Sequence, residues 1–230
     1  MFDIDVLLPD FWNILDAVPV TLAMAVLIFI TSTLVGGLFA LVEYRRIPVL
    51  RQMVIAYKVA FKGMPMVVVI FLAYYGLPPA LHFVASVLDV EVNAHSLPNW
   101  VIIIVALTAC VSAFQAEVVK GALNAFDSGQ SDAAHSLGYS NWQLFRRVMF
   151  PQIIVSAIPD LANSFMVIMK ALSLAFAIEV VDIFAQAQLT AALNFYYLEA
   201  FAIAVLFYMV IAWVVTKVAD KIEAALRVRT

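Results

Sequence analysis

The residues of this chain best suited to chemistry are polar side chains set inside long apolar runs. Lys170 lies within one such run, and Asn163 and Ser173 fall near the same face of a helix drawn through it. A charge in the hydrocarbon of a membrane costs about 2.5 kcal/mol or more, so a charged residue there is a functional candidate by default. Two roles remain open for this stripe. It faces an aqueous cavity where the Lys170 ammonium binds a carboxylate, or Lys170 pairs with an acid on a neighbouring helix.

Glu117 and Glu179 are the two acidic candidates. Glu117 lies three residues before Lys120, a spacing that predicts a local ion pair on a helix surface, with ligand contact as the alternative. Glu179 lies about 160° around a regular helix from Asn163, so it cannot share that residue's stripe. We expect Glu179 to face solvent, to meet a ligand ammonium group or to contact a neighbouring subunit.

The sequence does not indicate an enzyme. His82, His95 and His135 are widely separated, and none lies near Cys110 or a paired carboxylate, so neither a metal site nor a nucleophilic triad is supported. A phosphate-binding GxxxxGK[ST] motif does not occur. We therefore expect this chain to bind no metal, no cofactor and no nucleic acid.

The elements that position these residues are membrane spans. Of the 230 residues, 65% are hydrophobic and only 13% are charged, a composition too apolar for a soluble domain of this length. A spanning helix needs about 20 mostly apolar residues. Five segments qualify, near 18–42, 64–86, 99–119, 161–180 and 198–216. Without a linker or a convincing repeat, the sequence predicts an all-α membrane protein with one domain over residues 1–230.

The distribution of basic residues predicts how the spans are oriented, because short cytoplasmic loops retain Lys and Arg. Apart from Lys170, every basic residue follows the first, third or fifth span: Arg45, Arg46, Arg51, Lys58, Lys62, Lys120, Arg146, Arg147, Lys217, Lys221, Arg227 and Arg229. The amino-terminal piece and the 87–98 and 183–197 loops have none, although the first two carry acids such as Asp3, Asp5 and Glu91. We predict an outside N-terminus and a cytoplasmic C-terminus.

The acidic amino-terminal piece, residues 1–17, has its own pattern. It places Phe2, Phe11 and Trp12 among aspartates, which predicts a short amphipathic helix on the outer surface. It lacks a basic region and a small-residue cleavage site, so we read the first span as a retained helix and not as a signal peptide.

Residues 125–152 form a polar segment between the third and fourth spans. Asp127 and Ser128 can cap a short helix, and Gly138 can end that helix in a left-handed turn. Ser140 with Gln143 fits a capping box that opens a second helix, and Pro151 is expected to close it.

The second of these helices carries an apolar knob. Trp142 and Phe145 share a face at a spacing of three residues, and Arg146 and Arg147 lie beside them at the level expected for lipid headgroups. The segment therefore has the features of a docking site for a soluble partner.

The spacing of Asp132-Ala133-Ala134, Gly138, Phe145 and Pro151 resembles the EAA loop of ABC importer permeases. In that family the loop is the cytoplasmic segment that seats in a groove of the ATP-hydrolysing subunit. The resemblance implies that Asp132, Ala133, Ala134, Gly138, Trp142, Phe145 and Pro151 couple this chain to an ATPase.

Other motifs are similar to the polar amino-acid branch of this family over nearly the whole chain. Phe61 to Pro65 resembles the branch's F-R-G-T-P, and Ile158 to Phe165 resembles I-P-x-L-x-N-x-F. Further matches are Glu117, Lys120, Gly121, Gly129, Gln130, Lys170, Ser173 and Leu174. The chain departs from the pattern at Asp132, which replaces a glutamate, at Ala171-Leu172, which replaces a D-T pair, and at Glu179, which replaces a glycine.

The resemblance implies a five-helix permease of the type I ABC importer fold in a bacterial cell membrane. Its partners would be a second permease copy or a sister permease, a dimer of ATPase subunits that bind ATP and Mg, an extracellular substrate-binding protein and membrane lipid. The implied substrate is a polar amino acid, which the family moves when the 131–151 loop transmits closure of the ATPases. Cystine is favoured because the run from Leu88 to Asn93 resembles Gram-positive cystine permeases, with glutamine and basic amino acids next.

Two other functions fit parts of the pattern. An ATPase-independent channel or carrier would use Lys170 and Glu117 as an intramembrane relay. A membrane scaffold that transports nothing would use the loop only to recruit a soluble partner, and the polar stripe would then have no role in solute movement.

Overall fold

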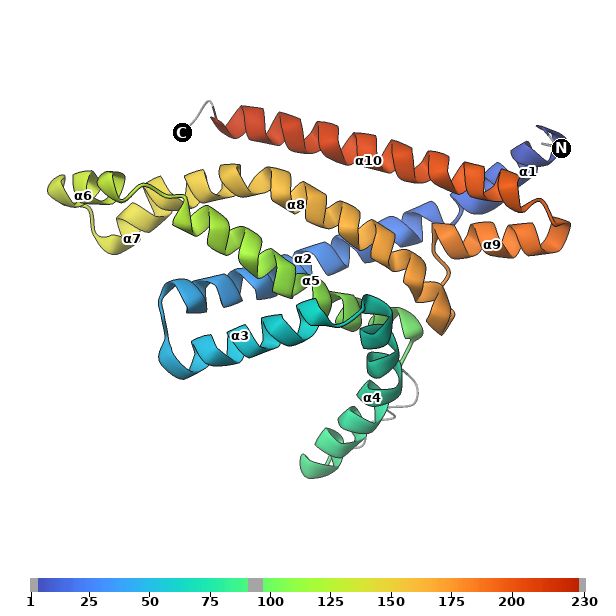
Figure 1. The fold of residues 1–230 in the computed structure, drawn as a ribbon, viewed down its shortest axis with the longest axis horizontal. Coiled ribbons are helices and arrows are strands. Elements are labelled where there is room, and N and C mark those ends of the chain that lie inside the picture. Colours follow the sequence, from blue (N-terminus) through green and yellow to red (C-terminus); the bar gives the residue numbers. More distant parts are fainter. Residues whose placement is uncertain (1–3, 91–96, 228–230) are drawn as a thin grey trace.

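The computed structural model describes residues 4–90 and 97–227, and that part of the chain is helical with short connections (Figure 1). The helices are α1 (Ile4–Leu15), α2 (Val18–Tyr44), α3 (Pro48–Gly63), α4 (Met66–Val87), α5 (Asn99–Asn124), α6 (Ser128–Ser136), α7 (Asn141–Leu144), α8 (Phe150–Leu172), α9 (Ile183–Asn194) and α10 (Tyr197–Arg227). A π-helical turn, η2 (Phe145–Met149), joins α7 to α8, and a 3-10 turn, η3 (Ser173–Ile178), follows α8.

The predicted five spans are confirmed in number. By length and apolar composition, five helical stretches can cross a membrane: Val6–Tyr44, Met66–Val87, Asn99–Asn124, Asn141–Ile178 and Tyr197–Leu226. Most are longer than predicted because the helices continue past the apolar runs into polar sequence. At 31 residues, α10 is about 46 Å long by its helical rise and exceeds a hydrocarbon layer of about 30 Å.

Helices α2, α5, α8 and α10 run along the long axis of the molecule, and α4 points away from them at a steep angle to that axis (Figure 1). The chain turns at Met64 and Pro65, where the backbone is extended, with φ −91° and ψ 139° at Met64. A residue before proline is pushed out of the helical region by the proline ring, which explains the break. The predicted second span is thus helical but steeply angled to the long axis, and the basic α3 packs on α2 and α5.

The core lies where α2 crosses α5. Gly36 makes this close approach possible, since a Cβ atom there would lie 2.9 Å from both the Ala116 amide nitrogen and the Ser112 carbonyl oxygen. Those atoms belong to backbone and cannot rotate away. Around the crossing, α8, η3 and α9 add the large buried side chains Ile168, Met169, Leu172, Ile178 and Ile183.

The amino-terminal helix α1 packs against α10 and α9. The rings of Phe11 and Phe207 lie 5.0 Å apart, and the buried Asp10 carboxylate accepts hydrogen bonds from Asn194 Nδ2 at 3.1 and 3.2 Å. Asp3 and Phe2 of the predicted amphipathic segment lie outside the described residues. So do Glu91 to Asn93 of the cystine-like run, and Arg229.

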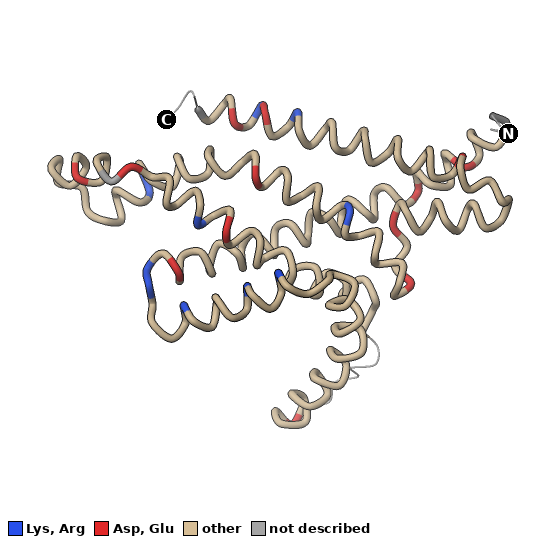
Figure 2. Tube along the Cα trace, viewed as in Figure 1, with Lys and Arg blue, Asp and Glu red and all other residues tan. Residues whose placement is uncertain are grey.

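Basic residues gather at one end of the bundle, where α2 turns into α3 and where α6 and α7 lie (Figure 2). We call this the basic end, and we call the other end, which bears α1 and α9, the opposite end. This separation is the feature from which the membrane orientation was predicted.

Candidate functional site

One face of α8 is exposed and mostly polar, with the apolar Val167 between Asn163 and Lys170. Ser156, Asp160, Asn163 and Lys170 are all exposed and follow one another at spacings of four, three and seven residues, which places them on one side of a helix. We call these four residues the polar face. Sequence reasoning found Asn163 and Lys170 but missed Ser156 and Asp160. The same helical period, continued toward the basic end, would have found both.

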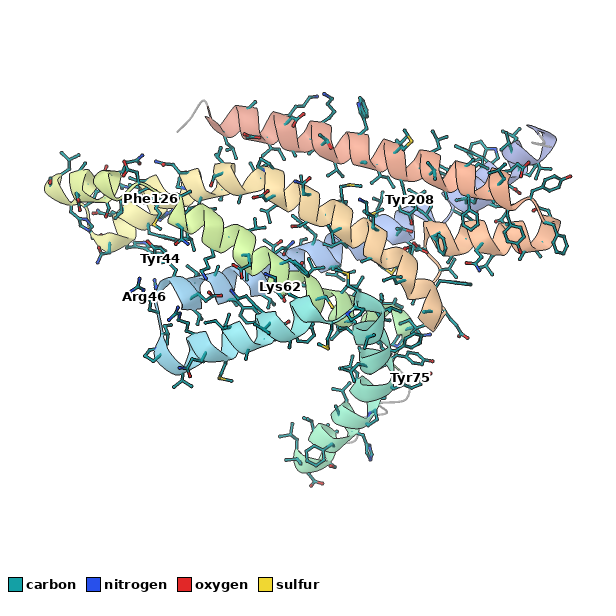
Figure 3. The ribbon with its side chains drawn as sticks, in the orientation of Figure 1. Tyr44, Arg46, Lys62, Tyr75, Phe126 and Tyr208 are labelled. Atoms are coloured by element: carbon teal, nitrogen blue, oxygen red, sulfur yellow. The ribbon has the colours of Figure 1, made fainter. Side chains whose placement is uncertain are left out.

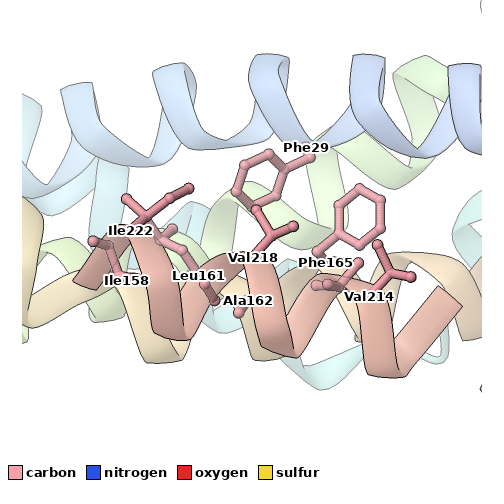
Figure 4. Close-up of a pocket in the computed structure, with 10 residues that line it drawn as sticks. Phe29, Ile158, Leu161, Ala162, Phe165, Val214, Val218 and Ile222 are labelled. Atoms are coloured by element: carbon pink, nitrogen blue, oxygen red, sulfur yellow. The ribbon is translucent and has the colours of Figure 1, made fainter. Parts of the chain in front are cut away.

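The remaining faces of α8 are covered or apolar. Ile153 and Ala157 pack with Ala40 of α2 and Leu123 of α5. Toward α10, an apolar groove of about 350 Å³ is lined by Phe29, Ile158, Leu161, Ala162, Phe165, Val214, Val215, Val218, Ala219 and Ile222 (Figure 4). A groove without a polar side chain has nothing to orient a polar ligand. The polar face is therefore the side of α8 suited to polar contacts.

Lys170 borders a cavity of about 350 Å³ between α8, α9 and α10, together with Ser173, Phe184 and Tyr208. Figure 3 labels Tyr208 on α10. Within the described residues no acidic group lies within 4.0 Å of Lys170. Lys170 thus lies beside a cavity and has no ion pair within the described part of the chain, and its binding of a carboxylate stays a prediction. Ser173 opens η3, so the regular helix assumed for residues 161–180 ends at Leu172.

The buried Asp182 holds the wall of this cavity in place. Its carboxylate accepts hydrogen bonds from the Ala185 amide at 2.9 Å, which caps α9, and from the Tyr208 hydroxyl at 3.1 Å. Burial raises the pKa of Asp182, although these hydrogen bonds act in the other direction. Asp182 is a positioning residue that sequence reasoning missed.

Glu179 sits at a backbone reversal. It adopts a left-handed conformation with φ 61° directly after η3, so the angle predicted from a regular helix does not apply. Its side chain is exposed and borders a cavity of about 570 Å³ with Val20, Asn99 and Trp100, and with Met24 of α2. Glu179 thus lies at the α2–α5 cavity and apart from the polar face.

Charged residues of α2, α3 and α5 form an ionic cluster. Its members are Glu43, Lys58, Lys62, Glu117 and Lys120. Lys58 Nζ donates to Glu117 Oε1 at 2.9 Å and also pairs with Glu43, while Lys62 Nζ lies 3.6 Å from Glu117. Lys120 pairs with Glu43. The prediction that Glu117 pairs with Lys120 is therefore wrong, because each of the two residues pairs with another helix.

The physical reason lies in the burial of Glu43. Glu43 and Lys58 are each 5% exposed, and a buried carboxylate left unpaired is strongly destabilising, so it recruits the lysines of both neighbouring helices. Glu117 then takes its cations from α3. Among the described residues no ion pair joins Glu117 to Lys170, the two residues predicted to form a relay in an ATPase-independent carrier.

The polar loop has the helix caps that its sequence predicted. The Asp127 carboxylate accepts from the Gly129 amide at 3.0 Å and caps α6, and Gly138 is left-handed with φ 82° after that helix. Ser140 and Gln143 form the reciprocal capping box at the start of α7.

Pro151 does not close the second helix. The chain runs from α7 through η2 into α8, with Pro151 in the first turn of α8. A proline clashes with the carbonyl four residues earlier in an α-helix, and the wider π-helical turn Phe145–Met149 relieves that clash. The loop is therefore connected rigidly to the helix that bears the polar face.

Side-chain hydrogen bonds fix the loop further. His135 Nε2 lies 2.9 Å from Asn141 Oδ1 and links α6 to α7, and Gln152 Nε2 donates to Gln130 Oε1 at 2.8 Å and links α6 to α8. Neither link was predicted.

The aromatic knob is present and solvent-facing. Trp142 is 66% exposed and stacks on Phe145, with ring centroids 5.9 Å apart. Asp132, Ala133 and Gly138 are exposed as well, whereas Ala134 is buried. In the described ranges, no three or more His, Cys, Asp or Glu side chains are placed to hold a metal ion.

Known proteins are similar to this chain in sequence and in fold. Residues 12–228 match the sequence family described as "Binding-protein-dependent transport system inner membrane component". The chain is 33% identical to the probable amino-acid permease protein YxeN of Bacillus subtilis over 97% of its length and 96% of the relative's. It is 29% identical to the L-cystine transport system permease protein TcyL of the same organism, with coverages of 91% and 85%. The crystal structure of an amino acid ABC transporter with histidines superposes with a TM-score of 0.82 at 25% identity, covering 98% of this chain and 99% of that one.

Proposed function

The chain belongs to the family of binding-protein-dependent transport system inner membrane components, and from this premise we propose that it forms the translocation path of an ATP-driven importer for a polar amino acid. It is a multi-pass permease subunit of an ABC transporter in a bacterial cell membrane and not an enzyme. In this family a separate ATPase subunit hydrolyses ATP, and an ABC ATPase and a substrate-binding protein are the general partners. ATP and Mg would bind to that ATPase, with no cofactor in this chain.

The polar face of α8 is the observation that supports a translocation path. Its side chains are uncovered, and Lys170 lies without an acidic partner among the described residues, beside a cavity shared with α10. Intramembrane charges normally face a bundle interior or a water-filled cavity. A second permease, either another copy or a sister chain, would enclose the polar face and complete such a path.

The rigid loop supports coupling to an ATPase. Residues 131–151 present the stacked Trp142 and Phe145 beside two exposed arginines, and η2 joins this knob to α8 without a flexible linker. A push on the knob would therefore move the polar face directly. In this proposal the basic end is cytoplasmic and the N-terminus is outside, as the basic residues predict.

The proposed substrate is cystine, with glutamine or a basic amino acid next. The named relative that transports L-cystine supports this choice, and the Lys170 ammonium would bind a substrate carboxylate. Asn163 and Ser173 would add neutral hydrogen-bonding groups, and Glu117 and Glu179 would be less direct candidates because one lies in the ionic cluster and the other borders the α2–α5 cavity.

Uptake by reconstituted vesicles tests the proposal. Vesicles would contain this chain, its co-encoded ATPase and its binding protein, and would be offered labelled cystine, glutamine, arginine and histidine. We expect accumulation of one of these amino acids only when ATP is supplied on the ATPase side. Accumulation by this chain alone, driven by a membrane potential and indifferent to ATP, would instead establish the carrier.

A further inference from the structure

Asp160 is an acidic residue in the middle of α8 that neither the ionic cluster nor the loop employs. We infer that Asp160 is a binding position for the positively charged group of the substrate, separate from Lys170 and closer to the basic end. This inference rests on the proposed function and adds to it a charge preference, namely an ammonium or guanidinium group presented toward the carboxylate.

The position of Asp160 on the helix carries the first step. Its neighbours on the polar face, Ser156 and Asn163, are exposed with it, whereas Ala157 and Leu161 belong to the packed and apolar sides of the same turns. A carboxylate in a membrane-spanning helix faces either water or a cationic partner, because hydrocarbon cannot solvate it. Within the described residues no Lys or Arg pairs with Asp160. Within the proposed path, water and a mobile cation are the neighbours that this chain leaves for the carboxylate, and the second permease supplies the facing wall.

The local hydrogen bonds leave the carboxylate free. Ser164 Oγ donates to the Asp160 backbone carbonyl at 2.9 Å and so does not engage the carboxylate oxygens. Ser156 Oγ likewise donates to the Ile153 carbonyl at 3.0 Å. The Asp160 carboxylate can therefore accept hydrogen bonds from an ammonium group without first breaking an internal one.

The spacing from Lys170 determines how the two charges would be used. Ten residues separate them, which is about 15 Å along the helix axis. The ammonium and carboxylate of one α-amino acid are much closer together than this, so a single molecule cannot bind both residues with those two groups at once. A zwitterion would meet Lys170 with its carboxylate and Asp160 with its ammonium at successive positions along α8.

Thiol labelling tests the charge selectivity without any substrate or ATPase. The only cysteine, Cys110, is fully buried and is replaced in a Cys110→Ala background. Asn163→Cys then places a thiol one helical turn from Asp160. Its rate of reaction is measured with a cationic trimethylammonium methanethiosulfonate and with an anionic sulfonate analogue. We expect the cationic reagent to be favoured, and Asp160→Asn to reduce the ratio of the two rates at least about threefold, as expected for a charge near 6 Å in a partly aqueous site.

Matched variants make the result specific. Asp160→Glu should restore the ratio, Asp220→Asn on α10 should leave it unchanged, and Ser156→Cys should report the same preference from the other side of Asp160. Val210→Cys, exposed on an apolar stretch of α10, should not react with either reagent. An unchanged ratio in Asp160→Asn, or unreactive thiols at both polar-face positions, would overturn the inference.

Uptake measurements separate this inference from the proposed function. In the vesicles described above, Asp160→Asn should raise the concentration for half-maximal uptake of the transported amino acid several-fold, with Asp160→Glu close to wild type. An unchanged half-maximal concentration would overturn the role of Asp160 while the importer stands. If none of the four amino acids accumulated, the proposed function as an amino-acid importer would be contradicted. The ratio of the two labelling rates would still decide whether Asp160 attracts cations.

Discussion

Lys58 and Lys170 show two different ways in which this chain keeps a lysine among apolar helices. Lys58 is 5% exposed and is held by Glu43 and Glu117, whereas Lys170 is exposed beside a cavity with no acid within 4.0 Å among the described residues. A paired buried charge fixes neighbouring helices relative to one another, and an uncovered charge is available to a ligand. We therefore assign Lys58 to the fold and propose that Lys170 belongs to the path.

Replacing Lys58 should destabilise the protein far more than replacing its neighbour Lys62. Lys58→Met leaves the buried Glu43 with Lys120 alone, and breaking a buried pair in this way costs about 3–5 kcal/mol. Lys62→Met removes a side chain that is 37% exposed and should change the free energy of unfolding by less than about 1 kcal/mol. Denaturant unfolding of both variants in detergent measures the difference, and equal losses would contradict the assignment of Lys58 to the fold.

The same pairing predicts how stability depends on pH. Burial alone would lower the pKa of Lys58, but its hydrogen bonds and charge interactions with Glu43 and Glu117 outweigh burial and raise the pKa above 10.5. A raised pKa in the folded state contributes stability below pH 10.5, which is lost as the pH rises through the folded value. Thermal unfolding should therefore show a steeper loss above about pH 10.5 in the wild type than in Lys58→Met. If the stability of the wild type and of Lys58→Met fell equally with rising pH, the raised pKa of Lys58 would be contradicted.

At the level of elements, the crossing of α2 and α5 depends on one glycine of an adjacent pair. Gly36→Ala places a Cβ within 3.0 Å of backbone atoms of α5 and should destabilise the protein by about 1–3 kcal/mol. Gly37→Ala meets nothing within 4 Å and should be neutral or slightly stabilising, since alanine favours helix. Unfolding of the two variants in parallel tests the crossing. A Gly36→Ala protein as stable as the wild type would show that the helices do not approach this closely.

The turn between α6 and α7 depends on Gly138. Gly138 has a φ of 82°. Gly138→Val would force a β-branched residue into this left-handed region at a cost of about 1–2 kcal/mol or more, whereas the asparagine of Gly138→Asn can adopt that conformation. We expect Val to reduce copurification of the ATPase and Asn to retain most of it, with equal insertion of both into the membrane. If Val copurified as well as the wild type, the loop conformation would not matter for coupling.

Local sequence patterns predicted the elements well where the cause was local. The caps at Asp127 and Ser140 arise from side chains within three residues of the bonds they make, and the left-handed turn at Gly138 arises from the conformational freedom of glycine itself. The prediction that Pro151 ends the second helix was wrong because the effect of this proline depends on a π-helical turn that begins six residues earlier, at Phe145.

Tertiary contacts account for other misses. The partners of Glu117 and the hydrogen bond from Tyr208 to Asp182 depend on helices that are distant in sequence, and no spacing rule contains that information. The capping of α9 by Asp182 is local, since it uses the Ala185 amide three residues later, and it could have been predicted. The position of Asp160 on the polar face likewise follows from helical period alone and was available from the sequence.

At the scale of the whole molecule, composition was sufficient to predict the all-α membrane class and the five candidate spans. The steep angle of α4 was not predictable, because hydropathy measures length and not direction. One continuous helical element bears both features, with the knob at the basic end of α8 and the polar face along it.

Parallel measurement of uptake and ATP hydrolysis tests this account most directly. The same vesicles would carry wild type, Lys170→Gln, or the knob variant Trp142→Ala with Phe145→Ala. We predict that Lys170→Gln keeps the ATPase bound and hydrolysing while uptake falls at least about tenfold, the effect of losing roughly 1.4 kcal/mol of substrate binding. The knob variant should lose bound ATPase and uptake together. Normal uptake by Lys170→Gln at wild-type expression would contradict the claim that the polar face of α8 lines the path.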